Sequence, residues 1–181
     1  MTLEFKEDPS HREGAGRARP KLVEKLVDEA ICMANSEVGS GIIVVGVHDK
    51  IAGPEAFTGT ELRESDVEQK IFNASKPNMN VSATGFLFRE TRLLAVSIPE
   101  ARALYTRTDG AAKRRETDGG KFSCKPIPEE ARRAIDALRR NPDYTNGETD
   151  MVPEDLGLDV VEEAHRQLVL YRSCLLYTSP S

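Results

Sequence analysis

The chain has 181 residues and a formal net charge of −5 at pH 7, and 39% of its residues are hydrophobic while 30% are charged. This length allows one domain with a hydrophobic core, and no apolar run approaches the roughly 20 residues that a transmembrane helix needs. The first residues lack the basic and then apolar layout of a secretory signal, and the three cysteines show no CxxC spacing, so we expect a cytoplasmic protein without a zinc site or a disulfide framework.

The first part of the chain predicts a strand, a helix and a second strand. Residues 3–6 alternate between apolar and polar side chains, as in a short strand. In residues 21–35 apolar side chains recur at helical spacing, which predicts an amphipathic helix with Cys32 in the core. Residues 42–47 are apolar without alternation, which predicts a central strand covered on both faces.

The next part predicts a helix and two hairpins. Residues 61–75 carry a second amphipathic pattern, and residues 79–88 and 92–98 predict an antiparallel hairpin. A second, basic hairpin is predicted from residues 104–108 and 112–116, around a turn at Asp109 and Gly110.

Residues 129–140 predict a third helix, whose inward side chains are Ala131, Ala134, Ile135 and Leu138. This order of elements predicts an α+β fold with a mixed, mostly antiparallel sheet flanked by helices. We therefore expect one domain over residues 1–140.

The remaining residues differ in composition. Residues 141–173 contain eight acidic residues against two arginines, and we expect an acidic linker and the start of a truncated following region. Residues 174–181, CLLYTSPS, resemble a translated sequencing adapter, and we exclude them from the fold.

Three segments together resemble a known family. They are the LEFK of residues 3–6, then Ala34, Asn35 and Gly41, and then the IIVVGVHD of residues 42–49. In this order and spacing they resemble the Schlafen AlbA-like domains of bacteria, and the resemblance extends to about Glu130. It implies a DNA-binding domain of a bacterial regulator.

Relatives in this family are also named ATP-binding proteins. The glycine turn of residues 37–41 follows a helix, whereas a phosphate-binding loop precedes the positive N-terminus of one. We therefore expect no ATP or other cofactor at this turn.

A cluster of basic residues is the first candidate site. Residues 101–125 contain seven basic residues against three acidic ones, and such clusters attract phosphates. The residues expected to bind nucleic acid, with DNA favoured, are Lys6, Arg102, Arg107, Lys113, Arg114, Arg115 and Lys121. Tyr105 and Phe122 flank this cluster and could stack on unpaired bases. The alternative is a solvated hairpin whose arginines pair with Glu116, Asp118 and the acidic tail.

A nuclease is the second reading. The similarity to vertebrate Schlafen proteins implies a metal-assisted RNA-cleaving site, to which Glu4 and Asp49 would contribute. That family's first glutamate would precede Leu3, where this chain has only Met1 and Thr2. Two carboxylates are too few to hold magnesium or manganese, so we expect no catalytic or metal site. A protein-interaction module is the third reading, and a homo-oligomer is left open.

Overall fold

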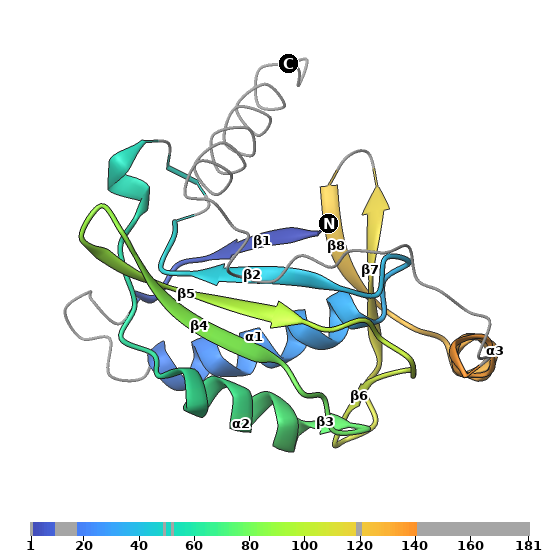
Figure 1. Cartoon of the computed structure of the whole chain (residues 1–181). Coiled ribbons are helices and arrows are strands. Elements are labelled where there is room, and N and C mark those ends of the chain that lie inside the picture. The colour runs from blue at the N-terminus through green and yellow to red at the C-terminus, as the bar shows by residue number, and fades with distance from the viewer. Residues whose placement is uncertain (1, 10–17, 49, 52, 119–120, 141–181) are drawn as a thin grey trace, which may run out of the picture.

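The computed structural model describes residues 2–9, 18–48, 50–51, 53–118 and 121–140 (Figure 1). Its elements in chain order are β1 (Leu3–Lys6), α1 (Ala18–Ala34), β2 (Gly41–Val45), η3 (Pro54–Ala56), α2 (Glu64–Ala74), β3 (Ser75–Lys76), β4 (Ser82–Phe88), β5 (Thr91–Ile98), β6 (Thr106–Arg107), β7 (Lys113–Asp118), β8 (Lys121–Pro126) and α3 (Glu129–Arg139). No helix among the described residues is long and apolar enough to cross a membrane.

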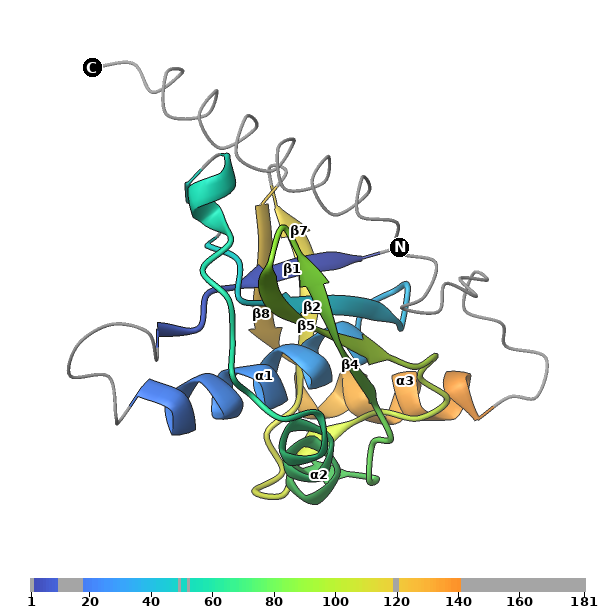
Figure 2. The ribbon, with the colours of Figure 1, turned by 60° about the vertical axis from the view of Figure 1, so that its left-hand side comes forward.

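A four-stranded sheet in the order β1-β2-β5-β4 forms the centre of the domain. The pair β1 and β2 is parallel, whereas β2 with β5 and β5 with β4 are antiparallel. Figures 1 and 2 show α1 and α2 together on one face of this sheet. The predicted α+β fold with a mixed, mostly antiparallel sheet is therefore confirmed.

Strand β2 is buried along all five of its residues, as its uninterrupted apolar sequence predicts. On one face of the sheet, Ile43 and Val45 join the core formed with α1 and α2. On the other face, Ile42 and Val44 pack with a second cluster that includes Phe88. The strand ends at Gly46, where φ is +97° and a Cβ atom would lie 2.8 Å from the carbonyl carbon of Gly59, so a glycine is required there.

The predicted basic hairpin is paired differently in the structure. β6 pairs with β3, and β7 pairs with β8 in an antiparallel hairpin that runs from Lys113 to Pro126. Asp109 and Gly110 form only a local turn, in which the Gly110 N–H donates to the Arg107 carbonyl over 2.9 Å. The prediction that residues 104–108 pair with 112–116 was wrong because each segment has another strand partner, β3 for β6 and β8 for β7. Ion pairs of Arg107 with Glu24 and Asp28 also attach β6 to α1, a long-range contact that no local pattern reveals.

The packing of α3 also differs from the prediction. Leu138 is 53% exposed and Ala134 is exposed, whereas Arg139 is buried. The Arg139 guanidinium donates to the carbonyls of Ala34 (2.7 Å), Ser36 (2.9 Å) and Ala103 (3.1 Å). The last carbonyls of α1 have no partners within their own helix, and a cation satisfies both their hydrogen bonding and the helix dipole. Hydrogen bonds from a buried guanidinium to backbone carbonyls, and not an apolar stripe, therefore hold the end of α3.

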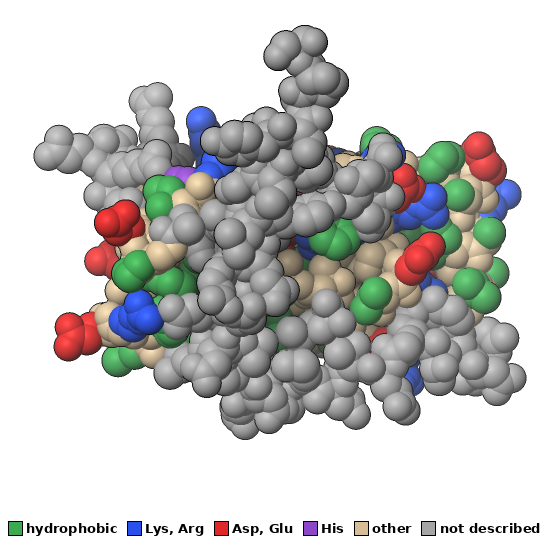
Figure 3. Space-filling view, turned by 90° about the horizontal axis from the view of Figure 1, so that it is seen from above, with side chains coloured by type: hydrophobic (Ala, Val, Ile, Leu, Met, Phe, Trp, Pro, Cys, Tyr) green, Lys and Arg blue, Asp and Glu red, His purple; other side chains and the backbone are tan. Residues whose placement is uncertain are grey.

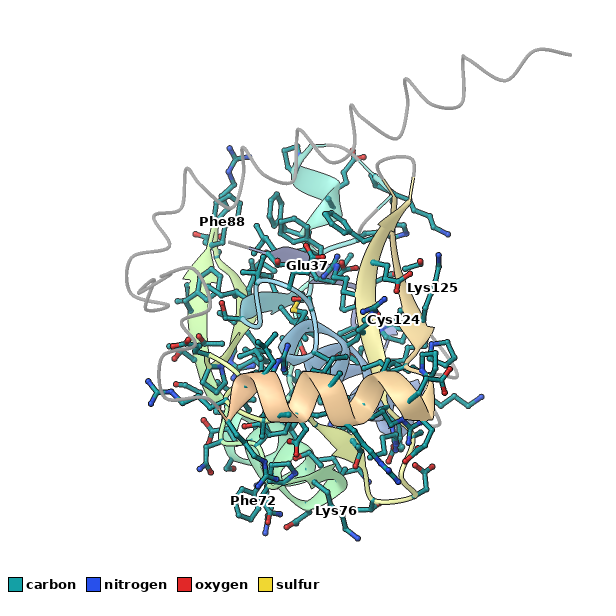
Figure 4. All side chains as sticks on the ribbon, turned by 90° about the vertical axis from the view of Figure 1, so that its right-hand side faces the viewer. Glu37, Phe72, Lys76, Phe88, Cys124 and Lys125 are labelled. Carbon is teal, nitrogen blue, oxygen red and sulfur yellow. A yellow bond between two sulfur atoms is a disulfide. The ribbon has the colours of Figure 1, made fainter. Side chains whose placement is uncertain are left out.

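Cys32 and Cys124 form a disulfide that joins α1 to β8, with their Cα atoms 5.9 Å apart (Figure 4). Cys32 lies in the core, as predicted, but it is also disulfide-bonded, which the cysteine spacing did not predict because the two cysteines are 92 residues apart in sequence.

Candidate nucleic-acid interface

The hairpin β7–β8 separates the consecutive cations Lys113, Arg114 and Arg115 between its two faces. Alternate residues of a strand point to opposite sides, and cross-strand partners share a side. Arg115 lies opposite Cys124, which is bonded to α1, so this is the inner face. Arg114 lies opposite Lys125 on the outer face. The three cations of this run therefore cannot form one continuous basic surface.

On the inner face, the Arg115 side chain is only 4% exposed and forms an ion pair with Glu4 of β1. Its guanidinium lies over the ring of Phe122, 4.4 Å from the ring centroid. The Nη1 atom of Arg115 is buried and has no hydrogen-bond partner among the described residues. A buried donor without an acceptor is rare in folded proteins.

Lys6 continues this chain of ion pairs along β1. Its Nζ atom lies 3.1 Å from Glu4 and 2.8 Å from Glu29 of α1. Burial lowers the pKa of Lys6, but the two carboxylates outweigh it, and the net pKa is raised. Glu4 is thus engaged by two cations, Lys6 and Arg115. Within the described part of the chain no group of three or more histidines, cysteines or carboxylates could hold a metal ion, and Asp49 lies outside that part.

On the outer face, Glu116 lies between two cations. The Arg114 Nε atom is 2.7 Å from this carboxylate and the Lys125 Nζ atom is 3.3 Å from it. Hydrogen bonds from Arg114 and Lys125 lower the pKa of Glu116. Arg114 and Lys125 remain nearly half exposed, at 44% and 47% of their side chains. The side chain of Lys121 lies outside the described set.

The other predicted cations are placed separately. Arg107 pairs with Glu24 and Asp28 of α1, and hydrogen bonds from its guanidinium to these carboxylates raise its pKa. Arg102 is exposed and forms no ion pair with a described residue. Because the N–H of Ala101 donates to the Gly39 carbonyl over 3.0 Å, Arg102 lies beside the loop that follows α1. Of the predicted cations, Lys6 and Arg115 come together because both contact Glu4. Lys113 and Arg114 are adjacent only as consecutive residues of β7.

Lys113 and Tyr105 are positioned through their backbones by Asn35. The Asn35 side chain donates to the carbonyls of Tyr105 (2.7 Å) and Lys113 (2.9 Å), and accepts from the N–H of Tyr105. Asn35 is 3% exposed. The sequence marks this asparagine only as a residue that follows a helix, so its role in fixing the hairpin was missed.

A pocket of about 550 Å³ lies between the loop of residues 35–38, β7 and α3, and we call it the hairpin pocket. Figure 4 views this side, with α3 in front, Glu37 above it, and Cys124 and Lys125 on the hairpin beside it. The lining residues are Thr2, Asn35, Ser36, Glu37, Val38, Arg114, Arg115, Glu116, Phe122, Ile135, Leu138 and Arg139. Sequence analysis did not predict this pocket, because its walls come from segments that lie far apart in the chain, from Thr2 to Arg139.

Charge on the surface is mixed. Where the face in Figure 3 is not covered by grey atoms, basic and acidic side chains lie next to one another and not in separate patches. The ion pairs of Arg114 and Arg107 show the same arrangement in detail. Any phosphate bound at the outer face would therefore compete with a carboxylate.

These features define a small α+β domain with a basic hairpin bonded to its first helix. The family model described as Schlafen, AlbA_2 matches residues 1–122, and the chain belongs to this family. The family supports a nucleic-acid-binding type of domain in general. The chain is also similar to the crystal structure of the DIP2311 protein from Corynebacterium diphtheriae, at 29% sequence identity and a TM-score of 0.53, over 69% of this chain and 22% of that chain. The match thus spans less than a quarter of DIP2311. Comparison with curated proteins finds no match.

Proposed function

We propose that this domain binds nucleic acid, and DNA in preference to RNA, through the outer face of the β7–β8 hairpin. The observation that carries the proposal is the pairing of Arg114 with Lys125 across the hairpin, where both side chains remain nearly half exposed. Two half-exposed cations at this spacing suit the phosphates of one strand, since phosphate contacts supply most of non-specific affinity. The role of the domain as part of a bacterial regulator belongs to the same proposal.

The phosphates would displace Glu116 from its two cations. The side chains of both ion pairs are 31–47% exposed, and solvent screening weakens such pairs, so this exchange requires little energy. Arg115 and Lys6 have a different role in the proposal: their ion pairs with the partly buried Glu4 and Glu29 position the hairpin. The proposal also includes Arg102, beside the loop that follows α1, and Lys121, the first residue of β8.

Fluorescence anisotropy of the full chain on DNA and RNA oligonucleotides, across a salt series, tests this proposal. Log affinity falls as log salt rises, and Arg114→Gln and Lys125→Gln should each make this slope less steep by about 0.9, the value for one lost phosphate contact. Glu116→Gln should raise the affinity, because it releases both cations. Lys76→Gln is the matched control, since Lys76 is exposed and lies away from Lys125 (Figure 4).

An unchanged salt slope in both cation variants would refute the hairpin as the contact surface. Tighter binding to RNA than to DNA of the same sequence would refute the preference for DNA. Arg115→Glu is not used here, since it would place a second carboxylate beside Glu4 and disturb the fold.

A further inference from the structure

We infer that the hairpin pocket holds one unstacked nucleotide of a single strand, with its base against Phe122. This inference rests on the proposed function and deepens it, because it assigns a ligand to a pocket that phosphate contacts on the outer face do not require. Two independent observations carry it: exposed apolar side chains that converge on the pocket, and the unpartnered buried nitrogen of Arg115.

The apolar walls come from three different elements. Val38 of the loop after α1 is 37% exposed, Phe122 of β8 is 56% exposed, and Leu138 of α3 is 53% exposed. All three line the same pocket. Apolar side chains scattered singly over a surface need no explanation, but three that surround one pocket form a surface suited to an apolar or aromatic group.

Phe122 is prepared for stacking. The guanidinium of Arg115 lies over its ring, which limits the ring's movement, while more than half of the side chain remains exposed. A base could stack on the exposed part, as bases do on aromatic side chains in proteins that bind single strands. Only an unpaired base presents its ring face in this way, since the bases of a duplex are stacked on each other.

Arg115 supplies a polar contact. The residue is 8% exposed and lines the pocket, and its Nη2 atom is occupied by Glu4 while its Nη1 atom has no acceptor among the described residues. A base carbonyl, a ring nitrogen or a phosphate oxygen would satisfy this donor. Most of the other lining residues are polar, and this free donor beside the apolar side chains of Val38, Phe122 and Leu138 combines the two kinds of contact that ligand sites use.

The size and charge of the pocket suit a single nucleotide. Its volume of about 550 Å³ falls in the usual range of about 300–1,000 Å³ for small-molecule sites. Glu37 and Glu116 also line it, so the carboxylates offset the positive charge and do not favour a polyphosphate. Arg114 at the rim connects the pocket to the outer face, where the neighbouring phosphates of the strand would lie.

The test compares the full chain on a single-stranded DNA oligonucleotide and on the corresponding duplex, at one salt concentration. Phe122→Ala should weaken single-strand binding about tenfold, within the range that alanine substitution gives for one base–aromatic contact, and should change duplex binding less than twofold. Phe72→Ala is the matched control, since Phe72 is also exposed (40%) but lies on α2, away from the hairpin (Figure 4). It should leave both affinities unchanged.

Two further variants keep the test decisive if Phe122→Ala disturbs the hairpin. Leu138→Ser alters the pocket from α3 and should also weaken only single-strand binding. Glu37→Gln should strengthen it, since it removes a negative charge from the pocket, while Glu55→Gln on η3 should have no effect. If the chain binds both oligonucleotides and all pocket variants bind like the wild type, the pocket inference is overturned while the proposed function stands. If the wild-type chain binds neither, the proposed function fails and this inference with it.

Discussion

Glu4 accepts from two cations that reach it from different parts of the chain. Arg115 approaches from β7 and Lys6 from its own strand, and the side chains of all three are at most 22% exposed. Charges at such sites are partly removed from water, so each depends on its partner for solvation. The residue that resembles a catalytic glutamate is therefore also a structural contact between β1 and the hairpin.

We expect Arg115→Met to lower the free energy of unfolding by about 3 kcal/mol, because it leaves the carboxylate of Glu4 with Lys6 alone. Glu4→Gln should have a similar effect, and the double variant should lose less than the sum of the two by about 1–3 kcal/mol. Urea unfolding of the four proteins measures this coupling. Arg114→Met is the control, since the Arg114 side chain is 44% exposed and its loss should change the stability far less. Additive single effects would mean that the buried pair does not form in solution.

At the scale of elements, the β7–β8 hairpin is attached to the rest of the domain at three places. The disulfide joins β8 to α1, Asn35 binds the carbonyl of Lys113, and Arg115 binds Glu4. These contacts hold the inner face of the hairpin and leave its outer face open. Rigid support of this kind gives the proposed contact surface a fixed position.

We expect Cys124→Ala to lower the free energy of unfolding by about 2–4 kcal/mol, since the bridge closes a long loop in the unfolded chain. A thiol reductant should lower the stability of the wild-type protein by the same amount and leave that of Cys124→Ala unchanged. Chemical denaturation with and without reductant measures both effects. Equal stability of the wild type in the two conditions would contradict the Cys32–Cys124 bridge.

At the scale of the whole molecule, local patterns predict the central sheet and its two covering helices. The apolar run in β2 and the helical spacing in α1 are strong because burial imposes a period on the sequence. The hairpin partner of β7 and the bridge from Cys32 could not be predicted, since they join residues far apart in the chain. Arg139 breaks the pattern itself, because a cation occupies the position where α3 is most buried.

For the candidate site too, the sequence predicts the local features and not the long-range contacts. The sequence shows the basic run at residues 113–115 and the nearby Phe122, and the structure places them on one hairpin. The sequence does not show which cations are neutralised, because Glu4 and Arg115 are 111 residues apart. The walls of the hairpin pocket come from the loop after α1, the hairpin and α3, and no local sequence pattern predicts that these segments meet.

Ion pairs distributed over the molecule predict how its stability depends on pH. Hydrogen bonds from Lys70 and Arg107 lower the pKa of Glu24, and those from its own backbone N–H and from Arg92 lower the pKa of Glu64. The pKa of Glu116 is lowered as well. Near pH 4 the unfolded chain therefore binds more protons than the folded one, and stability rises with pH in this range. The stability that these three glutamates contribute should be fully present above the ordinary glutamate pKa of 4.5, and it should fall as the pH decreases through their lowered pKa values in the folded protein. Lys6 has the opposite sign: its contribution persists up to its ordinary pKa of 10.5 and is lost as the pH rises through its raised pKa.

Urea midpoints measured between pH 3 and pH 7 test the acid limb. Glu24→Gln should lower the midpoint at pH 7 and approach that of the wild type as the pH falls through the lowered pKa of Glu24, because protonation removes the ion pairs with Lys70 and Arg107. Glu55→Gln, an exposed residue that forms no ion pair with a described residue, should run parallel to the wild type at every pH. Added salt should reduce the difference at pH 7, because the Glu24 side chain is 43% exposed and screening weakens its attraction to both cations. A Glu24→Gln curve that stays parallel to the wild type would mean that the Lys70 and Arg107 contacts do not persist in solution, and the placement of β6 against α1 would then need another cause.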